Sequence, residues 1–474
     1  MISISPLLKK IIARSPIEEP ELTTARESLP NDSVDLQPRH CLLIGLLKAH
    51  GYSLNASESR MLDDMLDDEE QVASDGMPAV SIASLLKLLI HKGRVLPDSI
   101  AVAVAFIFDN KLSTSQCALL LGLLAYTGYD KDPQVLAKTG RTMRAAADQI
   151  DRQELRTAVG KASHAFGRYE GGLCDIVGTG GDGHSTFNVS TTASIVASSI
   201  LLLSKHGNRA SSSTSGSADL LQAIQPKAPI IEAVTAQTLP KLYGKSSYAF
   251  LFAPIFHPGM GFVGKIRKDL GIRTIFNVLG PLANPAEGQI EARIVGIAEQ
   301  RMGPIFAEAL SLTGAEKVMV VCGAENLDEI SCAGKTNCWN VVDGKASPKI
   351  ETFELEPADF GLCTHPISDV AGGKSPSENA KILVDLLENK LNANHPILDF
   401  VLLNTAALLA VSGACEDPME VPQDGYSDVV IKERGPGGQR WKEGVRLARK
   451  AVESGKALDS LSKYIEATHS LQMR

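Results

Sequence analysis

The chain has 474 residues, which is enough for two or three domains and for a sizeable hydrophobic core. Hydrophobic residues make up 44% and charged residues 22%, as in ordinary globular proteins. The formal net charge of −8 argues against nucleic acid as a partner, and no apolar run reaches the roughly 18 residues of a membrane span. The eight cysteines form no CxxC pair, which argues against a zinc site or a disulfide framework and fits a reducing compartment.

The first fourteen residues, MISISPLLKKIIAR, are basic and lack acidic residues. An organelle presequence and a simple first helix are the two interpretations. Because glutamates begin at Glu18 and arginine is sparse, we favour the helix. We therefore expect a cytoplasmic protein, with a plastid or mitochondrial address as the alternative.

Two pairs of similar segments indicate an internal duplication of about 77 residues. PLLKKIIARS (residues 6–15) resembles SLLKLLIHKG (84–93), and CLLIGLLKAHGY (41–52) resembles GLLAYTGY (122–129). Chance similarity between amphipathic helices is the alternative, since all four segments carry apolar residues at helical spacing. The acidic segment MLDDMLDDEEQVASDGMP (61–78) is predicted to be a linker or a surface turn.

From Asp175 onward, short apolar runs bounded by glycine alternate with helix-like segments, which predicts an α/β fold with a parallel or mixed sheet. The predicted strands are CDIVG (174–178), AFLFA (249–253), TIFNVLG (274–280) and KVMVVCG (317–323). The predicted helices include STTASIVASSILLL (190–203), SADLLQAI (217–224), LDFVLLNTAALLAVSG (398–413) and KEGVRLARKAVESGKALDSL (442–461), with an exposed loop around RGPGGQ.

The stretch GTGGDG follows the strand CDIVG and precedes a predicted helix. Its glycines, Gly178, Gly180, Gly181 and Gly183, permit close backbone approach at a strand-to-helix turn, which suits an anion. The spacing matches neither a P-loop nor GxGxxG, and a purely structural turn is the alternative. Asp182 would repel phosphate, so it should contact a sugar hydroxyl or act through a metal ion.

Three further segments carry charge or hydroxyl groups after predicted strands or on a predicted helix. Lys205 and Arg209 precede a serine-rich run from Ser211 to Ser215, which predicts a second anion cradle rather than a flexible linker. The adjacent carboxylates Asp328 and Glu329 suit a divalent cation, with a solvated surface pair as the alternative. Arg267, in a basic turn or helix, can bind a carboxylate through two hydrogen bonds.

Together these stretches resemble the anthranilate phosphoribosyltransferases, class III phosphoribosyltransferases of the nucleoside phosphorylase-like type. The resemblance rests on GTGGDG with NVST, KHGNRA…SGSAD, HPGM…IRKDLGIRTIFNVLGPLANP and the acidic pair before Ser331, and it runs from about Leu85 to the C-terminal helices. It implies a small all-helical N-terminal domain, a larger α/β domain with a central mixed or parallel sheet flanked by helices, and a homodimer formed through the helical part.

The expected domains are residues 1–78 as an N-terminal extension that duplicates helices, 79–165 as a helical domain of the dimerisation type, and 166–474 as the catalytic α/β domain. A middle segment near residues 257–285 is a candidate to return to the helical domain. The extension departs from the family, and we expect it to modify oligomerisation or to cover the helical surface.

Site residues follow from the resemblance, position by position. It implies that phosphoribosyl diphosphate is bound by Gly178, Thr179, Gly181, Asp182, Asn188, Ser190, Thr191, Lys205 and Ser217. It implies that anthranilate is bound by Gly178, Asn208, His257 and Arg267, that Mg²⁺ is held by Ser190, Asp328 and Glu329, and that Arg267, Asn208 and Lys205 are the catalytic residues. His206 is a further candidate, with a packed histidine as the alternative. Thr214 stands where the family often has lysine, so a cationic contact from this loop is not expected.

The implied reaction is Mg²⁺-dependent transfer of the phosphoribosyl group from phosphoribosyl diphosphate to anthranilate in tryptophan biosynthesis. The partners are then two small-molecule substrates, with no nucleic acid and no membrane. A nucleoside phosphorylase of related fold, which needs no adjacent acidic pair, and a non-catalytic relative that binds nucleic acid are the alternatives. The intact glycine loop, Asp328, Glu329 and the negative net charge favour the transferase.

Overall fold

The computed structural model describes residues 4–30, 36–67, 76, 79–162, 165–210, 214–342, 349–416 and 430–472. The chain forms two compact units, each with its own interior. Unit 1 comprises Met1–Ala147 and His257–Ala283, and unit 2 comprises Asp148–Phe256 and Asn284–Arg474. Among the described residues, no helix is both long and apolar enough to cross a membrane.

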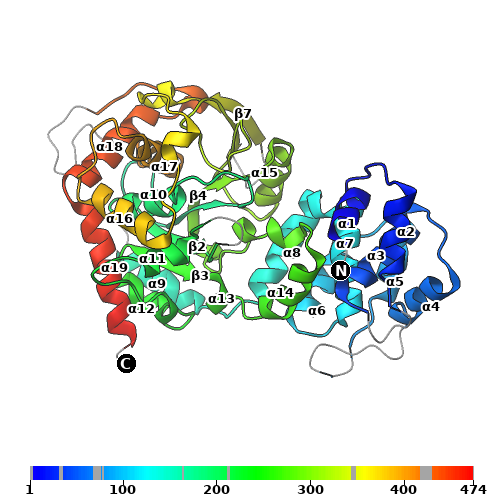
Figure 1. The fold of residues 1–474 in the computed structure, drawn as a ribbon. Coiled ribbons are helices and arrows are strands. Elements are labelled where there is room, and N and C mark those ends of the chain that lie inside the picture. The colour runs from blue at the N-terminus through cyan, green and yellow to red at the C-terminus, as the bar shows by residue number, and fades with distance from the viewer. Residues whose placement is uncertain are drawn as a thin grey trace. The chain divides into compact units, whose positions relative to one another are not determined.

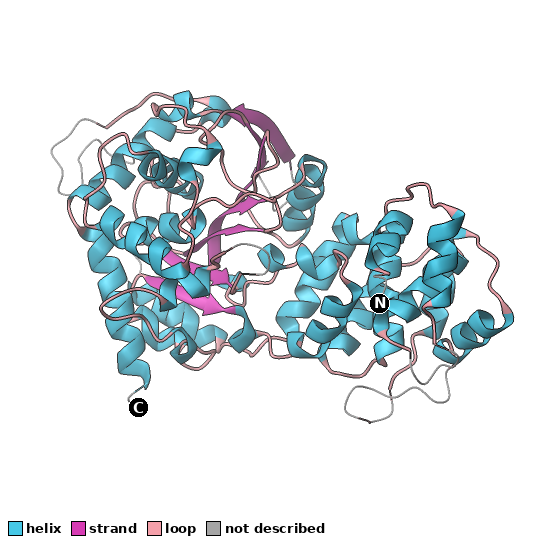
Figure 2. Ribbon diagram, in the orientation of Figure 1, coloured by secondary structure: helices cyan, strands magenta, loops and turns pink. Residues whose placement is uncertain are grey.

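The described residues of unit 1 form helices joined by loops (Figures 1 and 2). Its helices are α1 (Ser5–Ile12), α2 (Glu19–Glu27), α3 (Pro38–His50), α4 (Ala56–Met65), α5 (Ala83–Ile90), α6 (Pro97–Phe108), α7 (Thr114–Thr127), η1 (Tyr129–Lys131), α8 (Pro133–Ala145), α14 (Met260–Leu270), η3 (Ile275–Asn277) and η4 (Gly280–Leu282). The helices α3 and α7 are apolar on nearly all sides and contact each other, so they form the centre of the unit.

Two expectations for unit 1 were wrong. TIFNVLG forms the short helix η3 instead of a strand, because Asn277 Oδ1 accepts a hydrogen bond from Thr274 N–H (2.9 Å) and closes a turn. The segment 61–78 is not a linker from its start, because α4 continues to Met65. Residues 68–75 and 77–78 of that segment lie outside the described residues.

Unit 2 is built on a seven-stranded mixed sheet in the order β3-β2-β1-β4-β5-β6-β7, which confirms the predicted α/β class. The strands are β1 (Leu173–Gly178), β2 (Leu202–Gly207), β3 (Tyr248–Phe252), β4 (Ile290–Gly296), β5 (Lys317–Gly323), β6 (Thr336–Val342) and β7 (Lys349–Leu355). The first five are mutually parallel, and β6 and β7 continue as an antiparallel edge.

Helices flank this sheet (Figure 2). They are α9 (Arg152–Ala162), α10 (Val189–Ala197), α11 (Ser217–Gln222), η2 (Ile231–Ala233), α12 (Leu239–Tyr243), α13 (Ala253–Phe256), η5 (Glu287–Gln289), η6 (Gln300–Met302), α15 (Gly303–Leu312), η7 (Pro357–Phe360), η8 (Ile367–Val370), α16 (Pro376–Leu387), α17 (Pro396–Ser412), η9 (Pro436–Gly438), α18 (Trp441–Glu453) and α19 (Lys456–Gln472). The buried helix α17 contacts β1, β4 and β5 of the sheet and the helices α10 and α18.

Two predicted helices of unit 2 needed correction. The segment 442–461 is divided between α18 and α19, because Gly455 adopts a positive φ of 75°, which stops the first helix. The segment 190–203 is helical only to Ala197, and its last two residues already belong to β2.

The strand order places three loops at one edge of the sheet. The chain runs from β1 to β2 and β3 on one side and then returns to β4 and β5 on the other side of β1. In such open parallel sheets, ligands bind at the carboxyl ends of the strands where the order reverses. The loops that follow β1, β2 and β5 carry most of the residues named from the sequence.

Candidate functional site

The glycine loop begins where β1 ends. Gly178 pairs in register with Gly296, the last residue of β4, and Thr179 N–H donates to Gly296 O (2.9 Å). Gly180, Gly181 and Gly183 have φ angles of 70°, 78° and 82°, a region that favours glycine. The loop therefore turns sharply at the edge of the sheet, as the glycine pattern predicts.

The loop is built against Asp328, which follows β5. Gly180 N–H donates to Asp328 Oδ2 (2.6 Å). A Cβ atom on Gly178 would overlap Asp328 Oδ2, and one on Gly296 would overlap the Asp328 carbonyl oxygen. Two strand-end glycines thus provide the space in which this carboxylate approaches the loop.

Three carboxylates meet here. Burial raises the pKa of Asp328 to about 7, and the charge of Asp182 and a hydrogen bond with its side chain contribute in the same direction. Burial likewise raises the pKa of Glu329, and the charges of Asp328 and Asp182 add to this effect. Such mutual repulsion is relieved by a divalent cation.

The donors present fit Mg²⁺. The atom Glu329 Oε2 is buried and has no hydrogen-bond partner, so this oxygen is available as a metal ligand. Within the described ranges, no three His, Cys, Asp or Glu side chains form a complete cage for a metal ion. Mg²⁺ does not require one, because it usually binds one or two carboxylates together with substrate phosphates and water.

Lys205 interacts with Asp328 and Glu329 through its charge, and it lies within β2, not after it as the sequence suggested. Its buried Nζ donates to Ile176 O (2.6 Å) and to Ser190 Oγ (3.3 Å). Burial lowers its pKa to about 8, although Asp175, Glu329 and Asp328 act in the opposite direction. The Ser190 N–H donates to the Glu329 carboxylate, so Ser190 joins the lysine to the acidic cluster.

The first turn of α10 faces the loop after β2. Asn188, the residue before this helix, donates from Nδ2 to Ser215 O (2.8 Å), and its buried Oδ1 has no hydrogen-bond partner. Thr191 Oγ1 donates to Ser217 Oγ (2.8 Å). These polar side chains lie at the start of a helix, which is the place where proteins commonly bind phosphate.

The loop after β2 is closed by Asp219. Its Oδ2 accepts hydrogen bonds from Ala210 N–H (2.8 Å) and Gly216 N–H (3.0 Å), which brings the two ends of the loop together. Partial burial acts to raise the pKa of Asp219, but these hydrogen bonds and Arg209 outweigh it, so the pKa is lowered. Arg209 forms an ion pair with Asp219 (3.0 Å), and Asn208 is exposed. Residues 211–213 lie outside the described part.

Two of the predicted anthranilate residues belong to unit 1. His257 is buried, and its Nε2 lies 3.1 Å from Ala283 O. Arg267 lies on α14 with its guanidinium 5.7 Å from the centre of the Phe276 ring, and partial burial lowers its pKa. The other predicted site residues belong to unit 2.

Two residues near Lys205 were not identified from the sequence. Asn284 Nδ2 donates to Asp175 Oδ2 (2.9 Å) and to Ser204 O (2.8 Å). Burial raises the pKa of Asp175, and the charge of Lys205 opposes this effect. For Asp175, the sequence offered one signal, an acidic residue inside the apolar strand CDIVG. Asn284 lies in a segment that the sequence indicates only as a turn.

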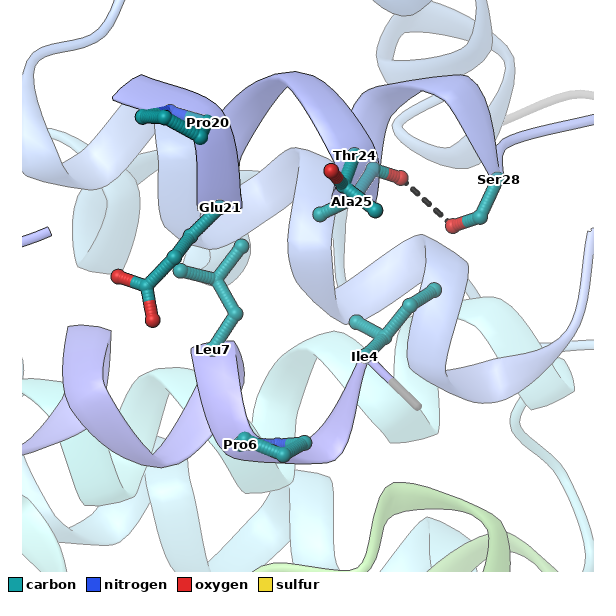
Figure 3. Close-up of a pocket in the computed structure, with 8 residues that line it drawn as sticks. All are labelled: Ile4, Pro6, Leu7, Pro20, Glu21, Thr24, Ala25 and Ser28. Carbon is teal, nitrogen blue, oxygen red and sulfur yellow. Dashed lines mark hydrogen bonds between the residues drawn. The ribbon is translucent and has the colours of Figure 1, made fainter. Parts of the chain in front are cut away.

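A cavity of about 350 Å³ lies in unit 1 between α1 and α2 (Figure 3). Leu7 and Ile4 line it from one side and Ala25 and Thr24 from the other. None of the predicted site residues lines this cavity, so it is separate from the chemistry described above.

Residues 170–458 match the family model described as glycosyl transferase family, a/b domain. The chain is 39% identical to anthranilate phosphoribosyltransferase of Schizosaccharomyces pombe over 80% of this chain and 96% of that protein. It is 38% identical to the Saccharomyces cerevisiae enzyme over 77% of this chain and 89% of that protein. The structure of the S. cerevisiae enzyme in complex with PRPP and Mg matches with a TM-score of 0.67 and 35% identity, covering 82% of this chain and 97% of that one. A variant of it in complex with 4-fluoroanthranilate matches with a TM-score of 0.65 and 34% identity, over 82% and 97% of the two chains.

Proposed function

This chain belongs to the anthranilate phosphoribosyltransferase family, and we propose that it transfers the phosphoribosyl group of phosphoribosyl diphosphate to anthranilate. The products are N-(5-phosphoribosyl)anthranilate and pyrophosphate, in tryptophan biosynthesis. The observation that carries the proposal is the meeting of Asp182, Asp328, Glu329 and Lys205 at the glycine loop, where the sheet order reverses.

For phosphoribosyl diphosphate, the proposal assigns Gly178, Thr179, Gly181 and Asp182 to the ribose and pyrophosphate. Asn188, Ser190, Thr191, Lys205 and Ser217 are assigned to its phosphates. The hydroxyl pair of Thr191 and Ser217 and the buried ammonium of Lys205 support this assignment. A buried cation beside an anion subsite favours the charge that develops on a leaving pyrophosphate.

Ser190, Asp328 and Glu329 would hold Mg²⁺, which when bound supplies positive charge at the departing pyrophosphate. The chain's own part is to keep two acids close to the glycine loop and to leave one Glu329 oxygen without a hydrogen bond.

For anthranilate, the proposal assigns the carboxylate to Arg267 and the remaining contacts to Gly178, Asn208 and His257. Arg267 and Asn208 hold the amine in line with the sugar carbon, so positioning contributes much of the rate. An aromatic amine is weakly basic and attacks as the neutral form, so no strong general base is required.

The test is to follow the fluorescence of anthranilate in the presence of phosphoribosyl diphosphate and Mg²⁺. We expect emission to fall only when all three are present with the protein, and EDTA to abolish the change. An assay with a nucleoside and inorganic phosphate runs in parallel. Release of a free base in that assay, with anthranilate unchanged, would replace the transferase by a phosphorylase.

We also propose that the protein acts in the cytoplasm, because its eight cysteines show no disulfide pattern. Fractionation of cells that express the full chain tests this, and recovery in an organelle fraction would overturn it.

A further inference from the structure

The eight α-helices from α1 to α8 are one four-helix pattern repeated along the chain. Helices α1 and α5 begin 78 residues apart, as do α2 and α6. The ends of α3 and α7, at His50 and Thr127, lie 77 residues apart. The cap residues of α4 and α8, Asn55 and Asp132, show the same separation.

The backbone details repeat as well. Arg14 and Lys92, one after each matching helix, both adopt a left-handed conformation, with φ angles of 54° and 55°. The N–H of Ser15 donates to Lys10 O (2.9 Å), and the N–H of Gly93 donates to Leu88 O (2.8 Å). Because non-glycine residues seldom adopt positive φ, this agreement is not expected of two unrelated amphipathic helices.

The two copies pack on each other reciprocally. A Cβ on Gly45 of α3 would overlap the Leu119 side chain of α7, and a Cβ on Gly122 of α7 would overlap the Leu42 side chain of α3. Leu42 and Leu119 are equivalent residues, as are Gly45 and Gly122. The glycine of each copy thus meets the leucine of the other copy. This reciprocal contact is the pattern of a two-fold symmetric dimer interface.

Further contacts follow the same relation. Helix α1 contacts α7 as well as α3, and α5 contacts α3 as well as α7. The guanidinium of Arg14 and the ammonium of Lys92 lie 5.6 and 5.7 Å from the centre of the Tyr126 ring, so the two copies supply equivalent cations to one aromatic ring. Helix α14 contacts both α3 and α7.

We propose that the first copy, residues 4–67, is a built-in partner that closes within one chain a face that would otherwise pair with a second copy of this chain. Helix α7 is self-complementary, because its own Leu119 and Gly122 correspond to the Leu42 and Gly45 that now cover it. The covering residues are apolar and fully buried, so no part of this contact is left for a second chain. The full chain is therefore a monomer with respect to α7, unlike the homodimer implied by the resemblance.

Two substitutions at equivalent positions of the two copies test the proposal in the full chain. The molar mass in solution is measured by light scattering after gel filtration. Gly45→Leu blocks the covering helix and leaves α7 unchanged, so we expect the mass to double relative to the wild-type monomer. Gly122→Leu places the same obstruction on α7 itself, where it blocks pairing with α3 and with a second α7, so we expect the mass of one chain. Far-UV circular dichroism checks that both variants remain helical.

A wild-type dimer, or a helical Gly45→Leu variant with the mass of one chain, would overturn the proposal. If Gly45→Leu does not fold, a second experiment tests the same proposal without any substitution in the core. A protease site is inserted between Asp67 and Ala79, and the folded protein is cut. We expect the two fragments to remain together as one copy of each, and two copies of each would overturn the closure within one chain.

Discussion

Asp328→Asn should make the ligand-free protein more stable while removing its function. The buried carboxyl has a pKa of about 7, against an ordinary 3.8. Ionising it in the folded state therefore costs about 4 kcal/mol, at about 1.4 kcal/mol for each pKa unit. The amide of the variant has no charge to bury. Its oxygen can still accept from Gly180 N–H, and its nitrogen can donate to Asp182.

The direction in which the stability of the wild type changes with pH follows from the raised pKa of Asp328. Below about pH 4 the carboxyl is neutral in both the folded and the unfolded state, so wild type and variant should be equally stable. As the pH rises from 4 through 7, the unfolded state loses the proton first, and the wild type loses stability. The gain from Asp328→Asn should grow across this window and then remain constant at about 4 kcal/mol.

Thermal melts between pH 4 and pH 8.5, without Mg²⁺, measure this gain as a rise of several degrees in Tm at the alkaline end. Mg²⁺ with phosphoribosyl diphosphate should then raise the Tm of the wild type and not that of the variant. Glu466→Gln removes a carboxylate from the exposed surface of α19 and serves as the control. An Asp328→Asn protein that is no more stable than wild type at pH 8 would refute the electrostatic account of this cluster.

Three further substitutions probe separate parts of the site. Gly178→Ala places a Cβ on Asp328 Oδ2, so we expect kcat to fall at least about 100-fold; Gly334→Ala, whose Cβ would meet open space, should retain wild-type kcat in the same assay. Since Lys205 has a pKa of about 8, the wild-type KM for phosphoribosyl diphosphate should rise as the pH increases from 7 to 9.5. Lys205→Met should show a high KM that does not change over this pH range. The same rise of KM with pH in the variant would contradict the assignment. Arg267→Lys loses the planar fork that binds a carboxylate, so the KM for anthranilate should rise about 10-fold with the KM for phosphoribosyl diphosphate unchanged; a change in only the latter would reassign the residue.

The ends of β1 and β5 were predicted correctly from the apolar runs CDIVG and KVMVVCG, each of which finishes in glycine, whereas the same pattern in TIFNVLG does not form a strand. This placed the loops after β1 and β5 correctly at one edge, since parallel strands share the direction of their carboxyl ends. The starts of α11 at Ser217 and of α10 at Val189 were also predicted to within one residue. The pattern could not show which polar side chains form hydrogen bonds or ion pairs with one another.

Arg209 is an example. From the sequence it offered a fork for an anion, but in the structure it pairs with Asp219, ten residues further along the chain. Asn284 is another, because its partners Asp175 and Ser204 lie on two different strands. Such pairings depend on the three-dimensional register of separate elements, to which hydrophobic periodicity is blind. The strand prediction for residues 274–280 failed for a local reason, since a hydrogen bond that Asn277 Oδ1 accepts from Thr274 N–H closes a turn within an apolar pattern suited to a strand.

The charges at the glycine loop also suggest why the site tolerates an unfavourable ligand-free state. Burial disfavours the charge on Lys205 and the charges on Asp328 and Glu329 alike, and their mutual attraction only partly offsets this. A cation binding to the acids and a phosphate binding beside the lysine would each remove part of that cost. Because each ligand brings the opposite charge to the other, the binding of one should strengthen the binding of the other, as reciprocal coupling requires. The electrostatic cost carried by the folded chain thus becomes a preference for receiving metal and diphosphate together.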